Sequence, residues 1–183
     1  FREAVMSITG GHPLTTDGIP PDELPTAQRV LSRVADVCEH ESRNVHGHLR
    51  RNGVKIFAGV GRFQDPHAVI VENEGSTTQL QGEKILVAVG TRPAPIPRQP
   101  KEAAHLLNSD EILNIRELPR TLIVVGGGVI GIEYASMFAA LGVEVTLIEK
   151  RERPLEFLDR EILDELIHQM RDRELTFRFG EAV

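Results

Sequence analysis

Three glycines with the spacing of a phosphate-binding turn are the residues of this chain that most clearly predict chemistry. Gly126, Gly128 and Gly131 form a G-x-G-x-x-G pattern. In such a turn the first glycine permits the sharp bend from strand to helix, and the second lets the backbone approach a pyrophosphate. The third glycine lets the helix lie close to the strand. The intervening positions of this predicted dinucleotide site are Gly127, Val129 and Ile130.

The elements around this turn follow the order that a dinucleotide site requires. Leu122 to Val125 is a short, mostly β-branched apolar run, which predicts a parallel strand buried on both faces. Val129 to Leu141 predicts a helix whose unpaired N–H groups and dipole face the pyrophosphate. Small residues at positions 131, 135 and 139 predict that this helix lies close to the sheet. Glycine turns also occur for packing alone, but the combined order favours dinucleotide binding.

An acid is predicted at the end of the following strand, Val143 to Ile148. Glu149 lies 18 residues beyond Gly131, where a carboxylate accepts hydrogen bonds from an adenosine ribose. This carboxylate favours the free 2′-OH of NAD(H) and repels a 2′-phosphate. Three cations that could pair with the phosphate of NADP(H) follow it, namely Lys150, Arg151 and Arg153. The sequence therefore allows both nucleotides, and a solvated loop is the alternative interpretation of the three cations.

Composition and charge exclude several classes of function. The 183 residues are 40% apolar, which suffices for a sizeable core. The net charge of −6 argues against nucleic-acid binding, and no apolar run is long enough to span a membrane. The seven histidines lack cysteines or carboxylates at ligand spacing, so no metal site is expected. The single cysteine, Cys38, suits a cytoplasmic protein and is expected to be buried on the apolar side of a helix.

The rest of the chain predicts further helices and strands, so the fold class is α/β. Helices are predicted at residues 1–8, from an N-cap at Thr26 to about residue 52, at 110–113 after Ser109, and from Asp159 to about 171. Strands are predicted at 54–59, 84–89 and 175–179, together with a small antiparallel β-meander in which a turn at 59–63 leads to arms at 68–72 and 77–81. Residues 9–25 predict an exposed loop, and the four prolines of 91–100 predict an interdomain crossing.

These segments together resemble a known family. Gly59-Val60-Gly61-Arg62-Phe63, a strand that ends Ala88-Val89-Gly90-Thr91-Arg92-Pro93, and Val125-Gly126-Gly127-Gly128-Val129-Ile130-Gly131-Ile132-Glu133 occur in the order found in the flavin-dependent pyridine nucleotide–disulfide oxidoreductases. Within the family, Arg2-Glu3-Ala4-Val5 and Glu133-Tyr134-Ala135-Ser136 are most similar to the members that exchange hydride between two nicotinamide nucleotides.

The resemblance implies an enzyme with two cofactors, FAD and NAD(H) or NADP(H). It implies part of an FAD domain with the meander at residues 1–107, and a Rossmann-type parallel sheet of an NAD(P) domain at 108–183. Gly61 would lie near the flavin adenine, and Ala88, Val89 and Gly90 near the flavin pyrophosphate. Val129 occupies the position of an aromatic gate in some relatives. Glu133 would contact the nicotinamide side of the nucleotide or the flavin region, and a carboxylate that simply favours a helix N-terminus is its alternative.

The resemblance also implies parts outside this chain, which is interpreted as a fragment. The first FAD-binding glycine motif and a redox-active cysteine region would precede Phe1, and a dimerising domain would follow Val183. A homodimer or larger homo-oligomer is therefore expected of the parent protein, and catalysis by the fragment alone is not. The alternatives are a dithiol reductase related to lipoamide dehydrogenase, which needs a Cys-x4-Cys pair, and a non-catalytic dinucleotide-binding module.

Overall fold

The computed structural model describes residues 1–10, 26–96 and 105–183. Two compact units are distinguished, one of residues Phe1–Cys38 and Ile96–Val183 and one of residues Glu39–Pro95. Most of the loop predicted at 9–25 and the end of the proline-rich crossing at 91–100 lie outside the described residues. No helix within the described ranges is both long and apolar enough to cross a membrane.

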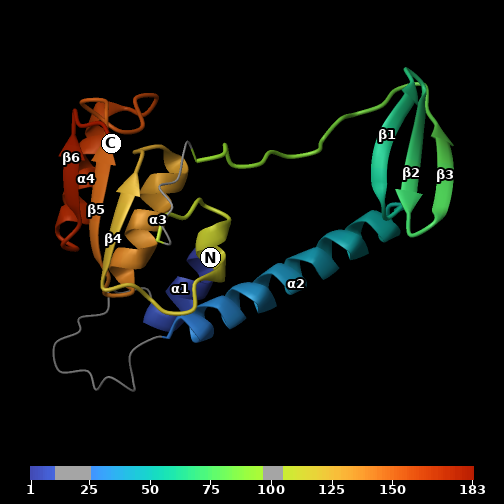
Figure 1. Cartoon of the computed structure of the whole chain (residues 1–183). Helices are drawn as coiled ribbons and strands as arrows, with labels where there is room; N and C mark the ends of the chain where they lie inside the picture. The colour runs from blue at the N-terminus through green and yellow to red at the C-terminus, as the bar shows by residue number, and fades with distance from the viewer. Residues whose placement is uncertain (11–25, 97–104) are drawn as a thin grey trace. The chain divides into compact units, whose positions relative to one another are not determined.

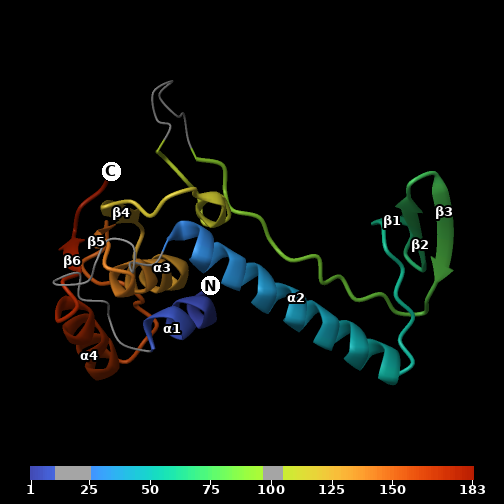
Figure 2. The same cartoon turned by 90° about the horizontal axis from the view of Figure 1, so that it is seen from below.

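The first unit is built on a parallel sheet of three strands. The strands are β4 (Thr121–Val125), β5 (Glu144–Glu149) and β6 (Thr176–Phe179), which lie side by side in the order β4-β5-β6 (Figure 1). Helices α3 (Val129–Ala140) and α4 (Arg160–Arg171) connect them and both lie on one side of the sheet (Figure 2). The α/β fold class and the parallel sheet that the sequence predicts are confirmed.

Within the described residues, only one face of this sheet is covered. Leu122 pairs with Val145 and Val124 with Leu147, and these side chains pack into the core with α3 and α4. On the opposite face, Ile123 is 64% exposed. The prediction that the first strand is buried on both faces is therefore wrong, because both crossover helices pack on the same side. A continuous apolar run gives no information about which side is covered.

The small face predicted for α3 is confirmed. Ala135 and Phe138 are fully buried in the core. Gly131 lies against the carbonyl oxygen of Gly126, and a Cβ at this position would collide with that oxygen. The helix therefore approaches the strand as closely as the third glycine of the pattern allows. Helix α4 also begins as predicted, since the Asp159 side chain accepts a hydrogen bond from the Glu161 N–H at 2.9 Å.

The part of the chain that the structure describes contains three further helices, namely α1 (Arg2–Thr9), α2 (Ala27–Arg51) and the 3₁₀ turn η1 (Glu111–Asn114). Helix α1 packs beside α3 (Figure 2), with Val5 and Met137 in a second small core. The Arg29 N–H donates to the Thr26 hydroxyl at 3.2 Å, as expected of an N-cap.

Two predictions about these helices are wrong. Cys38 is exposed, because only the first residues of α2, Ala27 and Val30, are buried. The apolar stripe of α2 is therefore buried only at the N-terminal end of the helix. The cap of η1 is also different from the prediction, since the side chain of Asn108, and not that of Ser109, accepts from the Asp110 and Glu111 N–H groups at 2.9 Å.

The second unit contains the predicted antiparallel meander. Its strands are β1 (Val60–Asp65), β2 (Ala68–Asn73) and β3 (Ser76–Gln81), in the order β1-β2-β3 (Figure 1). The turn predicted at 59–63 is wrong, since these residues except Gly59 belong to β1, and the strand predicted at 54–59 has no regular structure. Gly59 is the residue directly before β1. Its backbone lies close to β2, since a Cβ there would lie 2.5 Å from the Glu72 carbonyl oxygen.

The strand predicted at 84–89 is also absent. Residues 85–96 have no regular structure, and the side chains of Leu86 and Val89 are 91% and 88% exposed. Each of the two sheets in the described ranges consists of three strands, and neither pairs with this segment. A strand needs a partner for its backbone N–H and C=O groups. The apolar sequence alone does not supply one.

Candidate functional site

The glycine turn leaves open space beside its backbone. Gly126 continues the sheet by donating its N–H to the Ile148 carbonyl at 2.8 Å, and its φ of 107° belongs to a region that favours glycine. A Cβ at Gly126 or at Gly128 would have no heavy atom within 4 Å. These two glycines are therefore not required by packing against neighbouring atoms, and the space beside them is free for a ligand.

The start of α3 presents hydrogen-bond donors at this space. Gly128 is the N-cap residue in an extended conformation, and no side chain in the described ranges caps the helix. The first intrahelical bond runs from the Ile132 N–H to the Gly128 carbonyl at 3.0 Å. The N–H groups of the first turn have no helical acceptor, and the helix dipole is positive at this end. Val129 and Ile130, which carry two of these groups, are 51% and 59% exposed.

Gly127 has a different role from its neighbours because the segment that follows β5 lies directly against it. We refer to residues 150–158 as the 150–158 segment. The Leu155 N–H donates to the Gly127 carbonyl at 3.3 Å, and a Cβ on Gly127 would lie 2.8 Å from Cβ of Pro154. Sequence analysis missed this packing. The signal was present, because a third consecutive glycine exceeds what the G-x-G-x-x-G pattern requires.

Glu149 is almost fully buried at the end of β5, with 4% of its surface exposed. Its Oε2 accepts from the Gly127 N–H at 2.6 Å and from Arg151 Nη2 at 3.1 Å. Its Oε1 accepts from the backbone N–H and the Nε of Arg151 at 3.0 and 2.9 Å. The side-chain and backbone hydrogen bonds from Arg151 lower the pKa of Glu149 from 4.5 to about 2, against the opposing effect of burial. The carboxylate is charged and already occupied by donors of the chain itself.

The three cations behind Glu149 lie in different surroundings. Arg151 forms the ion pair with Glu149, and its side chain is 41% exposed. Arg153 Nη1 lies 3.4 Å from Asp164 of α4, and Lys150 is exposed. The sequence allowed all three to pair with a 2′-phosphate or to form a solvated loop, and among the described contacts Arg151 is the cation that pairs with Glu149.

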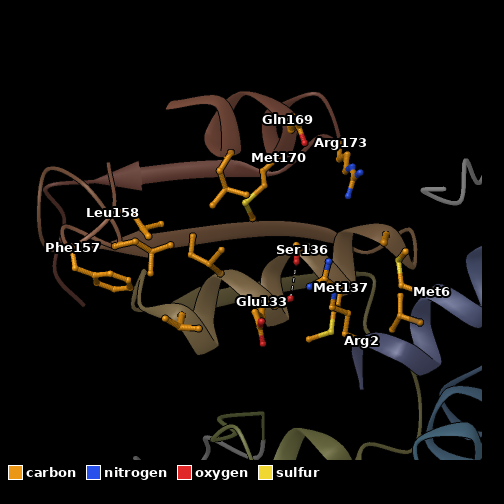
Figure 3. A pocket seen from close by; sticks show the side chains of 16 residues that line it. Arg2, Met6, Glu133, Ser136, Met137, Phe157, Leu158, Gln169, Met170 and Arg173 are labelled. Atoms are coloured by element: carbon orange, nitrogen blue, oxygen red, sulfur yellow. Dashed lines mark hydrogen bonds between the residues drawn. The ribbon is translucent and has the colours of Figure 1, made fainter. Parts of the chain in front are cut away.

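A cavity of about 490 Å³ lies along the outer side of α3. It is lined by Val129 and Glu133 of α3 and by residues of α1, α4 and the 150–158 segment. Figure 3 shows Phe157 toward one end of the cavity and Met6 of α1 toward the other. Glu133 is exposed, and its carbonyl accepts from the Ser136 hydroxyl at 2.8 Å. The structure thus brings two predicted residues, Val129 and Glu133, to one cavity that begins at the first turn of α3.

The residues predicted to contact FAD lie in the other unit. Gly61 is an exposed residue of β1, and a Cβ there would be in ordinary contact with Val69 Cγ1 at 3.8 Å. Ala88, Val89 and Gly90 belong to the irregular segment after the meander, where Gly90 has a φ of 68°. Their contact with a flavin stays a prediction.

The glycine turn fits a dinucleotide on three observations. The space at Gly126 and Gly128 admits a phosphate group, the α3 N-terminus offers donors, and a buried carboxylate lies at the end of the neighbouring strand. These features suit a pyrophosphate flanked by a ribose.

Comparison with known proteins gives a consistent result. The family described as "Pyridine nucleotide-disulphide oxidoreductase" matches residues 2–183. A soluble pyridine nucleotide transhydrogenase of Mycobacterium bovis is 42% identical over the whole of this chain, which spans 40% of that relative. A protein of the same name from Chromohalobacter salexigens is 38% identical over 84% of the chain and 33% of its own length.

Solved structures show the same architecture. The HOCl-induced flavoprotein disulfide reductase RclA of Escherichia coli superposes with a TM-score of 0.73 at 26% identity, covering 99% of this chain and 39% of that protein. The chain thus spans about two fifths of the length of these relatives or less.

Proposed function

This chain belongs to the pyridine nucleotide–disulphide oxidoreductase family, and from that premise we propose that it binds nicotinamide nucleotides within a flavin-dependent oxidoreductase. The proposed reaction is hydride transfer between NADH or NADPH and NAD(P)⁺ through FAD, as in a soluble pyridine nucleotide transhydrogenase. The 42% identity to relatives with that name supports this choice within the family.

The single observation that carries the proposal is the glycine turn. Gly126 and Gly128 leave open space next to the uncapped start of α3, so that a pyrophosphate can approach backbone donors without displacing any side chain. Glycines kept only for packing would show close neighbours at the Cβ position, as Gly127 and Gly131 do.

We propose the following roles for the residues of the turn and its surroundings. The turn from Gly126 to Gly131 holds the pyrophosphate, and Glu149 and Lys150 lie on the side of the adenosine ribose. Val129 and Glu133 line the cavity beside α3, and we propose that this cavity is on the nicotinamide side. We also propose that residues 108–183 form the NAD(P) domain and 1–107 part of an FAD domain, in which Gly61 and Ala88, Val89 and Gly90 contact the flavin.

A bound flavin would supply the group that accepts and returns hydride. The contribution of this chain is binding and orientation, because the backbone donors fix the pyrophosphate and thereby the reach of the nicotinamide. A cytoplasmic homo-oligomer is the proposed form of the parent protein, by analogy with the family.

Calorimetric titration with NADH and with NADPH tests nucleotide binding. In Gly128→Ala the new methyl group fills the open space, so binding should fall by at least about tenfold, which corresponds to ~1.4 kcal/mol. Gly47→Ala is the matched control, because Gly47 lies within α2 and, among the described residues, a Cβ there would meet only the flexible end of Arg51 at 3.3 Å. If the folded wild-type chain binds neither nucleotide, the proposed site is wrong.

A dithiol reductase is the second candidate, favoured by the structural likeness to RclA, which is described as a flavoprotein disulfide reductase. The two activities are distinguished in the parent flavoprotein by comparing NADPH-dependent reduction of an NAD⁺ analogue with that of a disulfide substrate such as lipoamide. Preferential reduction of the disulfide would replace the transhydrogenase proposal. A parent protein without flavin absorbance would instead indicate a non-catalytic nucleotide-binding module.

A further inference from the structure

The wall of the cavity beside α3 is mainly apolar and contains all three methionines of the chain. Met137 and Met170 are 7% and 3% exposed and belong to different hydrophobic cores, and Met6 of α1 is 48% exposed. A methionine side chain is unbranched and flexible, so a wall built from it adapts to apolar groups of different shape. The volume of about 490 Å³ is typical of a small-molecule site.

The 150–158 segment gives one end of the cavity an apolar character. Leu155 is buried and Leu158 is half-buried, whereas the side chain of Phe157 is 74% exposed (Figure 3). Among the described residues that line the cavity, none from this segment is charged. An alkyl chain that covered the Phe157 ring would remove apolar surface from water, which is favourable. This end of the cavity therefore suits a hydrocarbon group.

The other end of the cavity has two positive charges. Arg2 of α1 and Arg173, which follows α4, line the cavity from opposite sides, and both lie nearer to Met6 than to Phe157 (Figure 3). Neither arginine forms an ion pair within the part of the chain that the structure describes. Glu133 is the single carboxylate among the described lining residues, so one positive charge remains in excess. Because a guanidinium matches a carboxylate through two parallel hydrogen bonds, this end suits a singly charged anionic head group.

We propose that this cavity binds a long-chain carboxylate, that is, a fatty acid anion. The carboxylate head group lies between Arg2 and Arg173, and the alkyl chain follows the methionines toward the apolar end. The glycines of the turn do not line the cavity, so this site is distinct from the proposed pyrophosphate site, although Val129 and Glu133 are shared with the proposed nicotinamide side. Binding of a fatty acid does not require that the proposed nucleotide-binding function is correct.

The test is titration calorimetry of the full chain with dodecanoate and with dodecyltrimethylammonium, below their critical micelle concentrations and without nucleotide. The two ligands have the same chain length and opposite head-group charges, so dodecanoate should bind at least about tenfold more tightly. In Arg173→Gln, the affinity for dodecanoate should fall by about tenfold. Arg116→Gln is the matched control, because Arg116 is exposed and is not among the lining residues, and it should leave this affinity unchanged. Equal binding of both ligands would mean that the cavity accepts apolar groups regardless of charge, as it would the side chains of a protein partner, and would overturn the inference.

A second variant tests the apolar end and keeps the experiment decisive if Arg173→Gln does not fold. The affinity of the wild type should rise from octanoate to dodecanoate, and in Phe157→Ala this rise should be smaller because the longer chain loses its contact with the ring. An unchanged rise in Phe157→Ala, or equal losses in Arg173→Gln and Arg116→Gln, would contradict the proposed placement. A separate titration with NADH distinguishes the two proposals. Dodecanoate binding without NADH binding would refute only the proposed function, whereas NADH binding without dodecanoate binding would refute only the fatty acid site.

Discussion

At the scale of single residues, three consecutive glycines have three different reasons to be glycine. Gly126 adopts a φ of 107°, Gly127 lies against Pro154, and Gly128 faces open space. The first is required by the backbone, the second by packing and the third by the proposed ligand. The spacing in the sequence predicted a backbone role for Gly126 and a ligand role for Gly128, but it did not predict the packing of Gly127 against Pro154.

Substitution at two of these glycines should therefore separate stability from binding. Gly127→Ala places a methyl group 2.8 Å from Pro154 Cβ and should lower the free energy of unfolding by about 1–3 kcal/mol. Gly128→Ala, with φ of −75° and no neighbour within 4 Å, should leave stability unchanged within about 0.5 kcal/mol while weakening nucleotide binding as described above. Urea unfolding and calorimetric titration measure the two effects. Equal destabilisation by both changes would contradict this division of roles.

The buried carboxylate should make stability depend on pH in a defined window. The pKa of Glu149 is lowered from 4.5 to about 2, so between these values the unfolded chain binds more protons than the folded chain. The contribution of Glu149 to stability is therefore complete above pH 4.5 and is lost as the pH falls toward 2. The difference in unfolding free energy between wild type and Glu149→Gln should shrink over that range. Glu144→Gln, at an exposed position on the same strand, is the matched control for loss of a carboxylate.

The hydrogen bonds of Glu149 also show where prediction from sequence reaches its limit. Its position at the strand end follows from the 18-residue spacing after Gly131, and the structure places it there. Its occupation by Gly127 and Arg151 does not follow, because one partner is 22 residues away and the other depends on a side-chain rotamer. Local patterns predict where a group lies. They do not predict what already occupies it.

At the scale of elements, the sequence predicted those whose shape depends on local chemistry. The turn, α3 and β5 follow from glycine spacing and apolar periodicity, and α4 follows from its Asp159 cap. The strands predicted at 54–59 and 84–89 failed because their existence depends on partner strands distant in the sequence. The predictions that Cys38 and Ile123 are buried were wrong for a similar reason. Whether an apolar face is exposed depends on which distant element packs against it.

The one-sided sheet leads to an unequal response to substitution on its two faces. Leu147→Ala removes a fully buried side chain between α3 and the sheet and should lower the free energy of unfolding by about 2–5 kcal/mol. Ile123→Thr changes a side chain that is 64% exposed, keeps β-branching and should change stability by no more than about 0.5 kcal/mol. Chemical denaturation of both variants tests this. A large loss for Ile123→Thr would show that the open face of β4 is covered in solution.

At the scale of the whole molecule, the two units differ in how the chain between their elements is held. In the first unit, the 150–158 segment is tied to the glycine turn through Leu155 and to the end of β6 through the Gly180 N–H. In the second unit, residues 85–95 have no regular structure although their first part has the composition of a buried strand. The segment joined to the proposed nucleotide site is thus fixed by hydrogen bonds, whereas the apolar run after the meander is not held by a sheet.

Amide hydrogen exchange should reveal this contrast directly. The N–H groups of β5 are paired with β4 on one side and β6 on the other, and those of β2 with β1 and β3, so both strands should exchange slowly. Residues 85–90 lack ladder hydrogen bonds, and Leu86 is 91% exposed, so their amides should exchange orders of magnitude faster than those of β5 under the same conditions. Protection of 85–90 comparable to that of β5 would contradict the exposed state. If that protection increased with protein concentration, pairing between copies would be its cause, since the sequence of this run satisfies the apolar requirement of a strand and lacks only a partner.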